Sequence, residues 1–251
     1  MPDAAPDAPQ TAAGRAPLPP GFLLRHGVVP LAVFAIAVAV IHWLNVDWRL
    51  ATRLYALEGG EWALRKAFVT ERLIHKIGHD LSIAAWVGVL IAWLLSFRRP
   101  RLRPWRRPLG YLLLAVALST LAVSAIKAKS NMDCPWDVQG LGGDRPHLTL
   151  YEARPHDLPH GRCFPAGHAS GGYAWMALYF AFLMIRPRWR WRGLAAGMGV
   201  GLTYGIAQQL RGAHFLSHDL WTAMICWTVA LLVYLWLRPK TPPGTDALPS
   251  R

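Results

Sequence analysis

Residues 28–40 have the sequence VVPLAVFAIAVAV, an apolar run without a charged or hydrogen-bonding side chain. A helix on the surface of a soluble protein needs a polar face that repeats at the helical period. Residues 112–125 lack such a face as well, and 53% of the whole chain is hydrophobic. These runs therefore predict helices that cross a membrane rather than helices of a soluble bundle.

The number and length of such runs predict an all-α membrane protein. Six of them reach or approach the ~20 residues that a helix needs to cross a bilayer. They are residues 28–45, 81–97, 109–126, 168–185, 194–210 and 219–237. We therefore expect six transmembrane helices in one domain, residues 28–237. Residues 1–27, rich in Pro and Ala, are expected to form a disordered cytoplasmic tail, and residues 238–251 a second cytoplasmic tail.

The net charge of +13 alone would suggest a nucleic-acid ligand, but the arginines cluster in short loops between the predicted helices. Residues 98–107 contain six Arg and residues 186–192 contain four, without an acidic residue in either loop. Short loops rich in Lys and Arg mark the cytoplasmic side of a membrane. We therefore expect a multi-pass protein of a bacterial-type cytoplasmic membrane, with both termini inside and no nucleic-acid partner.

Two segments fall on the expected outer side. Residues 46–80 mix apolar and basic side chains at a loosely helical spacing, which favours a helix in the membrane interface that forms a lipid entrance or only an anchor. The loop of residues 127–167 is long for a segment without structure, which favours a function. It contains Cys134 and Cys163, and an oxidising compartment permits a disulfide between them.

Residues 163–170, CFPAGHAS, stand at the start of the fourth predicted span. Pro165 suits the turn before a helix, and the small residues Ala166 and Gly167 leave their backbone N–H groups open to a ligand. Donors at a helix N-terminus favour an anion, and His168 can carry a proton near neutral pH. The segment predicts a phosphate site with an acid beside it; the alternative is a capped helix with an incidental histidine.

Three motifs at span ends carry a resemblance to a known family. Lys127 is followed after six residues by Cys134-Pro135; residues 165–168 are PAGH; and residues 212–219 are GAHFLSHD. In this order they resemble the type-2 phosphatidic acid phosphatase superfamily, integral-membrane lipid phosphatases related to vanadium haloperoxidases. That family has Lys-x6-Arg-Pro, Pro-Ser-Gly-His and Ser-Arg-x5-His-x3-Asp.

The chain departs from this pattern at several positions. Cys134 stands in place of the first Arg, and Ala166 in place of the Ser. Gln208 occupies the position of the third-motif Arg, while Arg211 lies only three residues before the histidine. His218 occupies the position of the Asp, and Asp219 follows it. One residue turns a helical side chain by about 100°, so these shifts leave His218 open as an alternative nucleophile.

The resemblance implies a role for each matching residue. His214 attacks phosphorus to give a phosphohistidine, Asp219 holds its other ring nitrogen, and His168 protonates the leaving group. The phosphate oxygens are bound by Lys127, Arg211 and the amides of Ala166 and Gly167. Arg162, or else Arg145 or Arg154, replaces the missing first-motif Arg. No cofactor and no metal is expected.

The resulting interpretation is a membrane phosphatase that acts on a lipid phosphate or pyrophosphate at the outer face. Its partners would be the phosphorylated lipid and the surrounding membrane lipids; the sequence carries no signal for an oligomeric state. A phosphotransferase on the same scaffold would use the same phosphohistidine. A non-catalytic lipid-binding or transport protein is the alternative from another class, supported by the shifted Arg and Asp positions.

Overall fold

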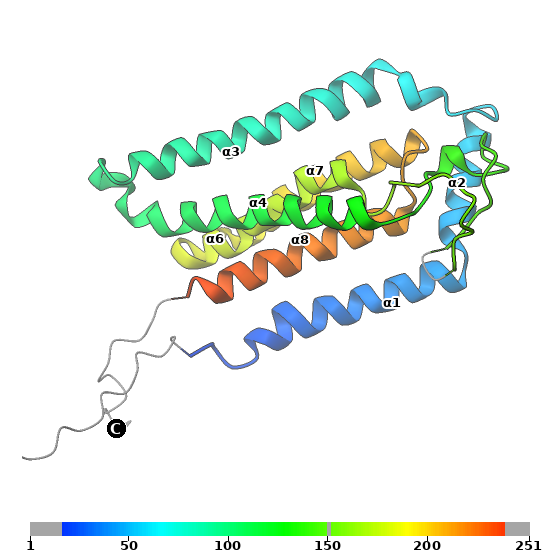
Figure 1. Ribbon diagram of the computed structural model, residues 1–251. Coiled ribbons are helices and arrows are strands. Elements are labelled where there is room, and N and C mark those ends of the chain that lie inside the picture. The colour runs from blue at the N-terminus through cyan, green and yellow to red at the C-terminus, as the bar shows by residue number, and fades with distance from the viewer. Residues whose placement is uncertain (1–16, 150–151, 239–251) are drawn as a thin grey trace, which may run out of the picture.

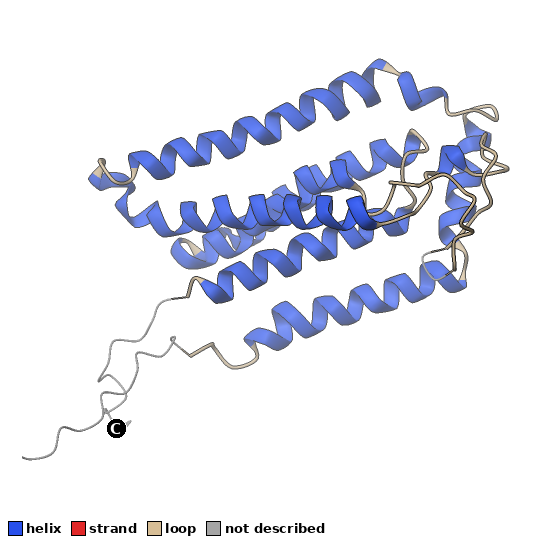
Figure 2. Cartoon of the chain, viewed as in Figure 1, coloured by secondary structure: helices blue, strands red, loops and turns tan. Residues whose placement is uncertain are grey.

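A computed structural model describes residues 17–149 and 152–238 of the protein (Figure 1). Helices make up most of the described chain (Figure 2), and the extended structure within it is limited to two isolated bridges, Val138 with Arg145 and Gln139 with Gly143. The prediction of an all-α protein is therefore confirmed. Most of both predicted tails lies outside the described residues.

Most of the long helices contain the apolar runs of the sequence, and others fall in the mixed apolar and basic residues 46–80. In chain order they are η1 (Leu24–Val28), α1 (Val29–Trp43), α2 (Val46–Leu57), η2 (Ala63–Lys66), η3 (Phe68–Ile77), α3 (Gly78–Leu95), η4 (Pro100–Trp105), α4 (Arg106–Lys129), η5 (Pro135–Asp137), α5 (Gly167–Tyr173), η6 (Ala174–Ala177), α6 (Leu178–Ile185), η7 (Pro187–Trp189), α7 (Arg190–Leu210) and α8 (Leu216–Trp236). The η segments are short turns of 3₁₀ or π type, several of them continuous with the neighbouring α-helix.

In the described part of the chain, four helical stretches are long and apolar enough to cross a membrane: Leu24–Trp43, Phe68–Leu95, Pro100–Lys129 and Leu216–Trp236. The predicted fourth span is helical too, but it is divided into α5, η6 and α6. The predicted fifth span falls in α7, where Gly, Arg and Gln stand among the apolar residues. The chain is thus a membrane protein with four candidate spans by length and composition, and six crossings stay a prediction.

The long helices α1, α3, α4, α7 and α8 lie side by side, and α2 crosses one end of the bundle (Figure 1). At that end α4 runs into the long loop, α5 begins, and α7 turns into α8. The Arg-rich turns η4 and η7 lie at the opposite end. This arrangement places the three segments singled out in the sequence at one end and the two basic loops at the other.

The outer helices carry their large apolar side chains on the outside. In α1, Leu31, Val33 and Ile36 are 54%, 62% and 65% exposed. In α3, Leu81 and Ile91 are 63% and 52% exposed. Such an exposed apolar surface has no counterpart on a soluble monomer, where large apolar patches are rare. Contact with lipid chains accounts for it.

Close packing of α7 against the fourth predicted span depends on glycine. A Cβ atom built on Gly201 would lie 2.2 Å from the ring of Tyr173, and one on Gly197 would lie 2.3 Å from the backbone nitrogen of Met176. Small residues allow membrane helices to approach this closely. The predicted packing role of the α7 glycines is therefore confirmed at these two positions.

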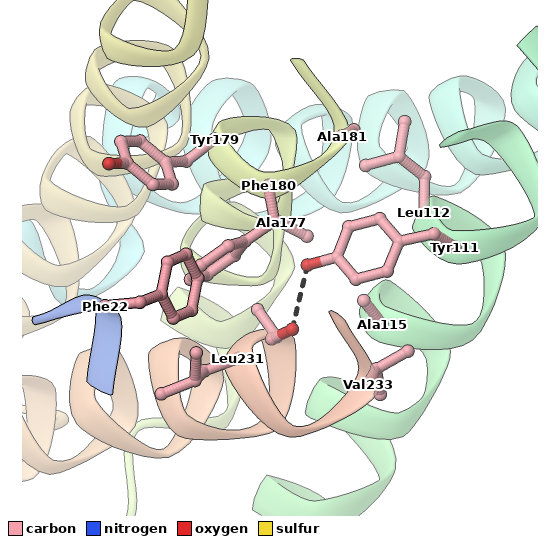
Figure 3. Packing of buried hydrophobic residues seen from close by; sticks show 11 residues of the cluster. Phe22, Tyr111, Leu112, Ala115, Ala177, Tyr179, Phe180, Ala181, Leu231 and Val233 are labelled. Atoms are coloured by element: carbon pink, nitrogen blue, oxygen red, sulfur yellow. Dashed lines mark hydrogen bonds between the residues drawn. The ribbon is translucent and has the colours of Figure 1, made fainter. Parts of the chain in front are cut away.

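The helical region begins before residue 28, the predicted boundary. Phe22 is 7% exposed and stacks on His26 and Tyr234, with ring centroids 4.1 Å and 5.6 Å apart. Figure 3 shows Phe22 in a buried cluster with Tyr179 and Leu231. This burial stabilises the turn η1, which the Pro- and Ala-rich composition of the preceding residues did not indicate.

Candidate active site

A cavity of about 400 Å³ lies at the end of the bundle where α4 ends and α5 begins. Its walls contain residues from all three sequence motifs: Lys127, Cys134, Trp136, Arg162, Cys163, His168, Gln208, Arg211, Ala213 and His214. None of these described lining residues carries a carboxylate. Three cationic side chains without an acid make the cavity suited to an anion.

The long loop is fixed over this cavity by covalent and polar contacts. A disulfide joins Cys134 and Cys163, whose Cα atoms are 5.2 Å apart. The backbone N–H of Cys163 donates to the carbonyl of Met132 at 2.9 Å, and the hydroxyl of Ser130 donates to the carbonyl of Phe164. These contacts tie the first motif to the second and place the carbonyl of Cys163 at the site.

The third motif is anchored to the same loop through Gly212. Its carbonyl accepts a hydrogen bond from the backbone N–H of Trp136 at 3.0 Å. Gly212 has a φ of 67°, and a Cβ there would lie 2.4 Å from the ring of Trp62. Glycine is the residue that adopts this conformation without strain. The tight turn brings the backbone toward the cavity just before His214.

His214 is held in one tautomer by a backbone carbonyl. The residue is 6% exposed, and its Nδ1 lies 2.7 Å from the carbonyl oxygen of Cys163. A carbonyl only accepts, so Nδ1 carries the hydrogen and Nε2 keeps its lone pair. Burial, aided by the nearby His218 and Lys127, lowers the pKa of His214 well below its usual value. The imidazole is therefore neutral, and the lone pair on Nε2 is not used by this contact.

Asp219 takes a different place from the predicted one beside His214. Its Oδ2 accepts a hydrogen bond from the hydroxyl of Tyr173 at 2.8 Å, and a Cβ on Gly205 would lie 2.2 Å from its Oδ1. Because α8 begins at Leu216, Asp219 lies in the first turn and faces α5 and α7. The carbonyl of Cys163, not Asp219, therefore orients the His214 ring.

His218 lies behind His214 rather than in the cavity wall. The two ring centroids are 5.8 Å apart, and His218 is 1% exposed. It lines a separate cavity of about 360 Å³, which also contains Asp47 and His147. Of the two candidate nucleophiles, His214 is the one that faces the cationic cavity.

The three cations of the cavity differ in how they are held. A Cβ on Gly167 would lie 3.4 Å from the Lys127 ammonium, so this glycine leaves room for the lysine side chain. The Nε of Arg211 donates to the carbonyl of Arg65 at 2.9 Å. Arg162 is exposed at the mouth. Each can present N–H donors to a phosphate.

Three arginines were candidates to replace the missing first-motif Arg, and the structure separates them. Arg145 and Arg154 both bind the carboxylate of Asp133, at closest N···O distances of 2.5 Å. Neither lines the cavity, whereas Arg162 does. Arg145 and Arg154 stabilise the loop through Asp133. Of the three candidates, Arg162 is the arginine that can reach a ligand.

The predicted role of the Ala166 amide does not agree with the structure. Ala166 is fully buried, and its N–H donates to the carbonyl of His218 at 3.3 Å. This donor is already used within the protein, because the first turn of α8 packs against the start of α5. Gly167 contributes space for Lys127 rather than a demonstrated hydrogen bond.

His168 lines the cavity from the start of α5. Its Nε2 is 3.4 Å from the carbonyl oxygen of Ile74, and its ring centroid is 4.9 Å from that of Tyr204. A carbonyl only accepts, so this contact places a hydrogen on Nε2. This placement suits a histidine that donates a proton to a group bound in the cavity.

Gln208, at the position of the family's third-motif Arg, is a cavity residue whose role the motifs alone did not indicate. It is 3% exposed and lines the cavity. Its Oε1 accepts from Arg211 at 3.5 Å, while its Nε2 has no hydrogen-bond partner among the described residues. Leaving a buried amide donor unpaired costs about 1–3 kcal/mol. The unused donor points to a ligand oxygen, and its position in place of the family's Arg was the available signal.

A metal does not fit the donors that the described chain brings together. Cys134, Asp137 and Cys163 offer ligand atoms within 4.8 Å of one another. The two sulfurs form the disulfide, however, and a metal requires thiolates. The positive groups around the cavity are protein side chains.

The comparison with protein families agrees with the geometry. The family model described as the PAP2 superfamily matches residues 108–242, which is more than half of the 251-residue chain and contains every residue that lines the cavity. No curated protein and no solved structure gives a significant match. The chain belongs to the PAP2 superfamily, a family of phosphatases on a helical membrane fold.

Proposed function

We propose that the protein hydrolyses a lipid phosphate or pyrophosphate monoester at the outer face of the cytoplasmic membrane, through a phosphohistidine on His214. The hydrogen bond from Nδ1 of His214 to the carbonyl of Cys163 is the observation that carries this proposal. It leaves the Nε2 lone pair as the nucleophile at a cavity that Lys127, Arg162 and Arg211 make positive.

The reaction has two steps. In the first, Nε2 of His214 forms a bond to phosphorus, the bond from phosphorus to the leaving oxygen breaks, and His168 gives that oxygen a proton. In the second, a water oxygen forms a bond to phosphorus, the bond from phosphorus to Nε2 of His214 breaks, His168 takes a proton from the water, and inorganic phosphate leaves. The three cations and the amide of Gln208 stabilise the charge on the phosphate oxygens in both steps.

A lipid substrate is favoured by where the cavity lies. It is at the end of helices that expose apolar side chains, so a headgroup can enter while its chains stay among lipids. The Arg-rich turns at the other end favour an outer orientation of the cavity. Cysteine substitutions at exposed Asp157 and Arg101 test this: an impermeant thiol reagent should label only the first in intact cells, and the reverse pattern would invert the topology.

The activity test uses purified protein in detergent micelles with a panel of polyprenyl pyrophosphate, phosphatidate, phosphatidylglycerol phosphate and phosphorylated lipid A. We expect release of inorganic phosphate from at least one of them. His214→Ala should abolish it, and His160→Ala, an exposed histidine of the same loop, should not. Transfer of the phosphate to a second lipid instead of water would identify a phosphotransferase, and wild-type release by His214→Ala would contradict the proposal.

A further inference from the structure

A second large cavity, of about 590 Å³, lies at the opposite end of the bundle from the catalytic cavity. Its walls come from η1, α6, α7 and α8 and include Arg25, His26, Tyr179, Arg190 and Trp191. Figure 3 shows how Phe22 and Tyr179, which also line it, pack on the buried cluster at this end. None of these side chains takes part in the proposed reaction.

The electrostatics of this inner cavity favour an anion. Among the described residues that line it there is no carboxylate, and there are two arginines. The Nε of Arg190 is buried and has no hydrogen-bond partner in the described part of the chain. His26 is occupied, because Nδ1 lies 2.8 Å from the carbonyl oxygen of Phe22 and Nε2 lies 2.9 Å from the hydroxyl of Tyr179. Arg25 and Arg190 are the cationic side chains of this cavity, and neither forms an ion pair with a described carboxylate.

An apolar groove continues from the inner cavity toward the middle of the bundle. It has a volume of about 320 Å³, and its lining, which includes Val33, Phe34, Met198 and Met224, contains no charged residue among those described. Pro30, Leu194 and Trp227 line both the cavity and the groove, so the two adjoin.

The dimensions of this composite site match one leaflet of a membrane. The groove reaches Ala37, twelve residues after Arg25 along the first helix. At the helical rise this distance is roughly 18 Å, and the hydrocarbon of one leaflet is about 15 Å thick, half of the whole core. A lipid whose charged head lies at Arg25 and Arg190 and whose chain runs along α1 would therefore extend through about one leaflet.

We propose that the inner cavity and its groove bind one anionic phospholipid from the leaflet that faces the Arg-rich turns. The phosphate lies between Arg25 and Arg190, and an acyl chain lies in the groove between α1 and α8. Arg with phosphate forms short charge-assisted hydrogen bonds, and tryptophan at the rim suits the interface depth. The site is separate from the catalytic cavity and does not depend on the reaction proposed for it.

Native mass spectrometry of the full-length protein in detergent tests this, with phosphatidylglycerol and phosphatidylcholine of identical acyl chains as probes. We expect the wild type to bind the first phosphatidylglycerol at least about tenfold more tightly than phosphatidylcholine, because both lipids carry the phosphate but the two arginines repel the choline cation. Arg25→Gln combined with Arg190→Gln should remove this preference. Arg101→Gln combined with Arg188→Gln, two exposed arginines at the same end, should retain it.

Two further measurements distinguish binding of the whole lipid from binding of its headgroup alone, and an effect on binding from an effect on folding. Glycerol 3-phosphate, which has the charge without the chains, should not displace the lipid. Arg25→Gln alone changes an exposed side chain, so it should keep the wild-type melting temperature and still weaken phosphatidylglycerol binding. Three results would each overturn the proposal. The double variant could bind phosphatidylglycerol as the wild type does, the wild type could bind the two lipids equally, or glycerol 3-phosphate could displace the lipid.

Discussion

Removing the disulfide between Cys134 and Cys163 should both destabilise the protein and misplace its nucleophile. The bond closes a loop with a sequence separation of 29 residues. The chain-entropy relation gives about 12 cal/mol/K for such a loop, or about 3.6 kcal/mol at 25 °C. For a chain of this length, a change of 1 kcal/mol shifts the melting temperature by about 2–4 °C, so the expected loss is roughly 7–14 °C.

The effect on activity has a separate physical cause. The carbonyl of Cys163 holds Nδ1 of His214, and the disulfide ties Cys163 to Cys134, which lies between α4 and η5. When this tether is lost, the carbonyl is free to shift, and a misplacement of about 1 Å at a reacting group costs about 10²-fold in rate. We therefore expect a lower kcat well below the melting temperature.

Thermal unfolding and phosphate release should be measured for the wild type and for Cys134→Ser combined with Cys163→Ser, each with and without a reductant. The reductant should lower the melting temperature and activity of the wild type and leave the variant unchanged, because the third cysteine, Cys226, is a buried free thiol in both. Equal melting temperatures and rates in all four samples would refute the reasoning.

Three other predictions concern the site. Replacing His168 with Ala should lower kcat by about 10²–10⁴-fold for alkyl phosphates and less for a pyrophosphate or an aryl phosphate, whose leaving groups need less protonation; equal losses for all would contradict its role as an acid. Gln208→Leu should lower kcat/KM by about 10²-fold without lowering the melting temperature, since it removes an unpaired buried donor. Burial lowers the pKa of His214, so the imidazole stays neutral as the pH falls through about 6.5, and the acid limb of kcat/KM should lie below that value. An acid limb centred at or above pH 6.5 would count against this assignment.

The helices and the grouping of the motifs followed from the sequence for clear physical reasons. The side chains of an apolar run such as residues 28–40 cannot be hydrated as those of a loop would be. In lipid, a helix forms because it pairs the backbone N–H and C=O groups of the run with one another. Consecutive spans alternate in direction, so the ends of α4 and α7 and the starts of α5 and α8 meet at one end. The sequence permitted a disulfide between the two cysteines of the expected outer loop, but it could not show that their Cα atoms lie close enough for one.

Contacts that depend on the backbone or on one helical step were not foreseeable. The partner of His214 is a carbonyl group, which every residue has and no sequence pattern marks. Whether Asp219 faces His214 depends on α8 starting at Leu216, because one residue turns a side chain by about 100°. The choice of Arg162 over Arg145 depended on Asp133, whose carboxylate binds the other candidates.

The central claim is that Nε2 of His214 carries the phosphoryl group during turnover. Rapid mixing of purified protein with its lipid substrate, an alkaline quench that preserves phosphohistidine, and peptide mass spectrometry test it directly. We predict a phosphoryl group on His214 in the wild type and in His160→Ala, and none anywhere in His214→Ala. A phosphoryl group on His218, or a phosphoenzyme and turnover in His214→Ala, would contradict the account.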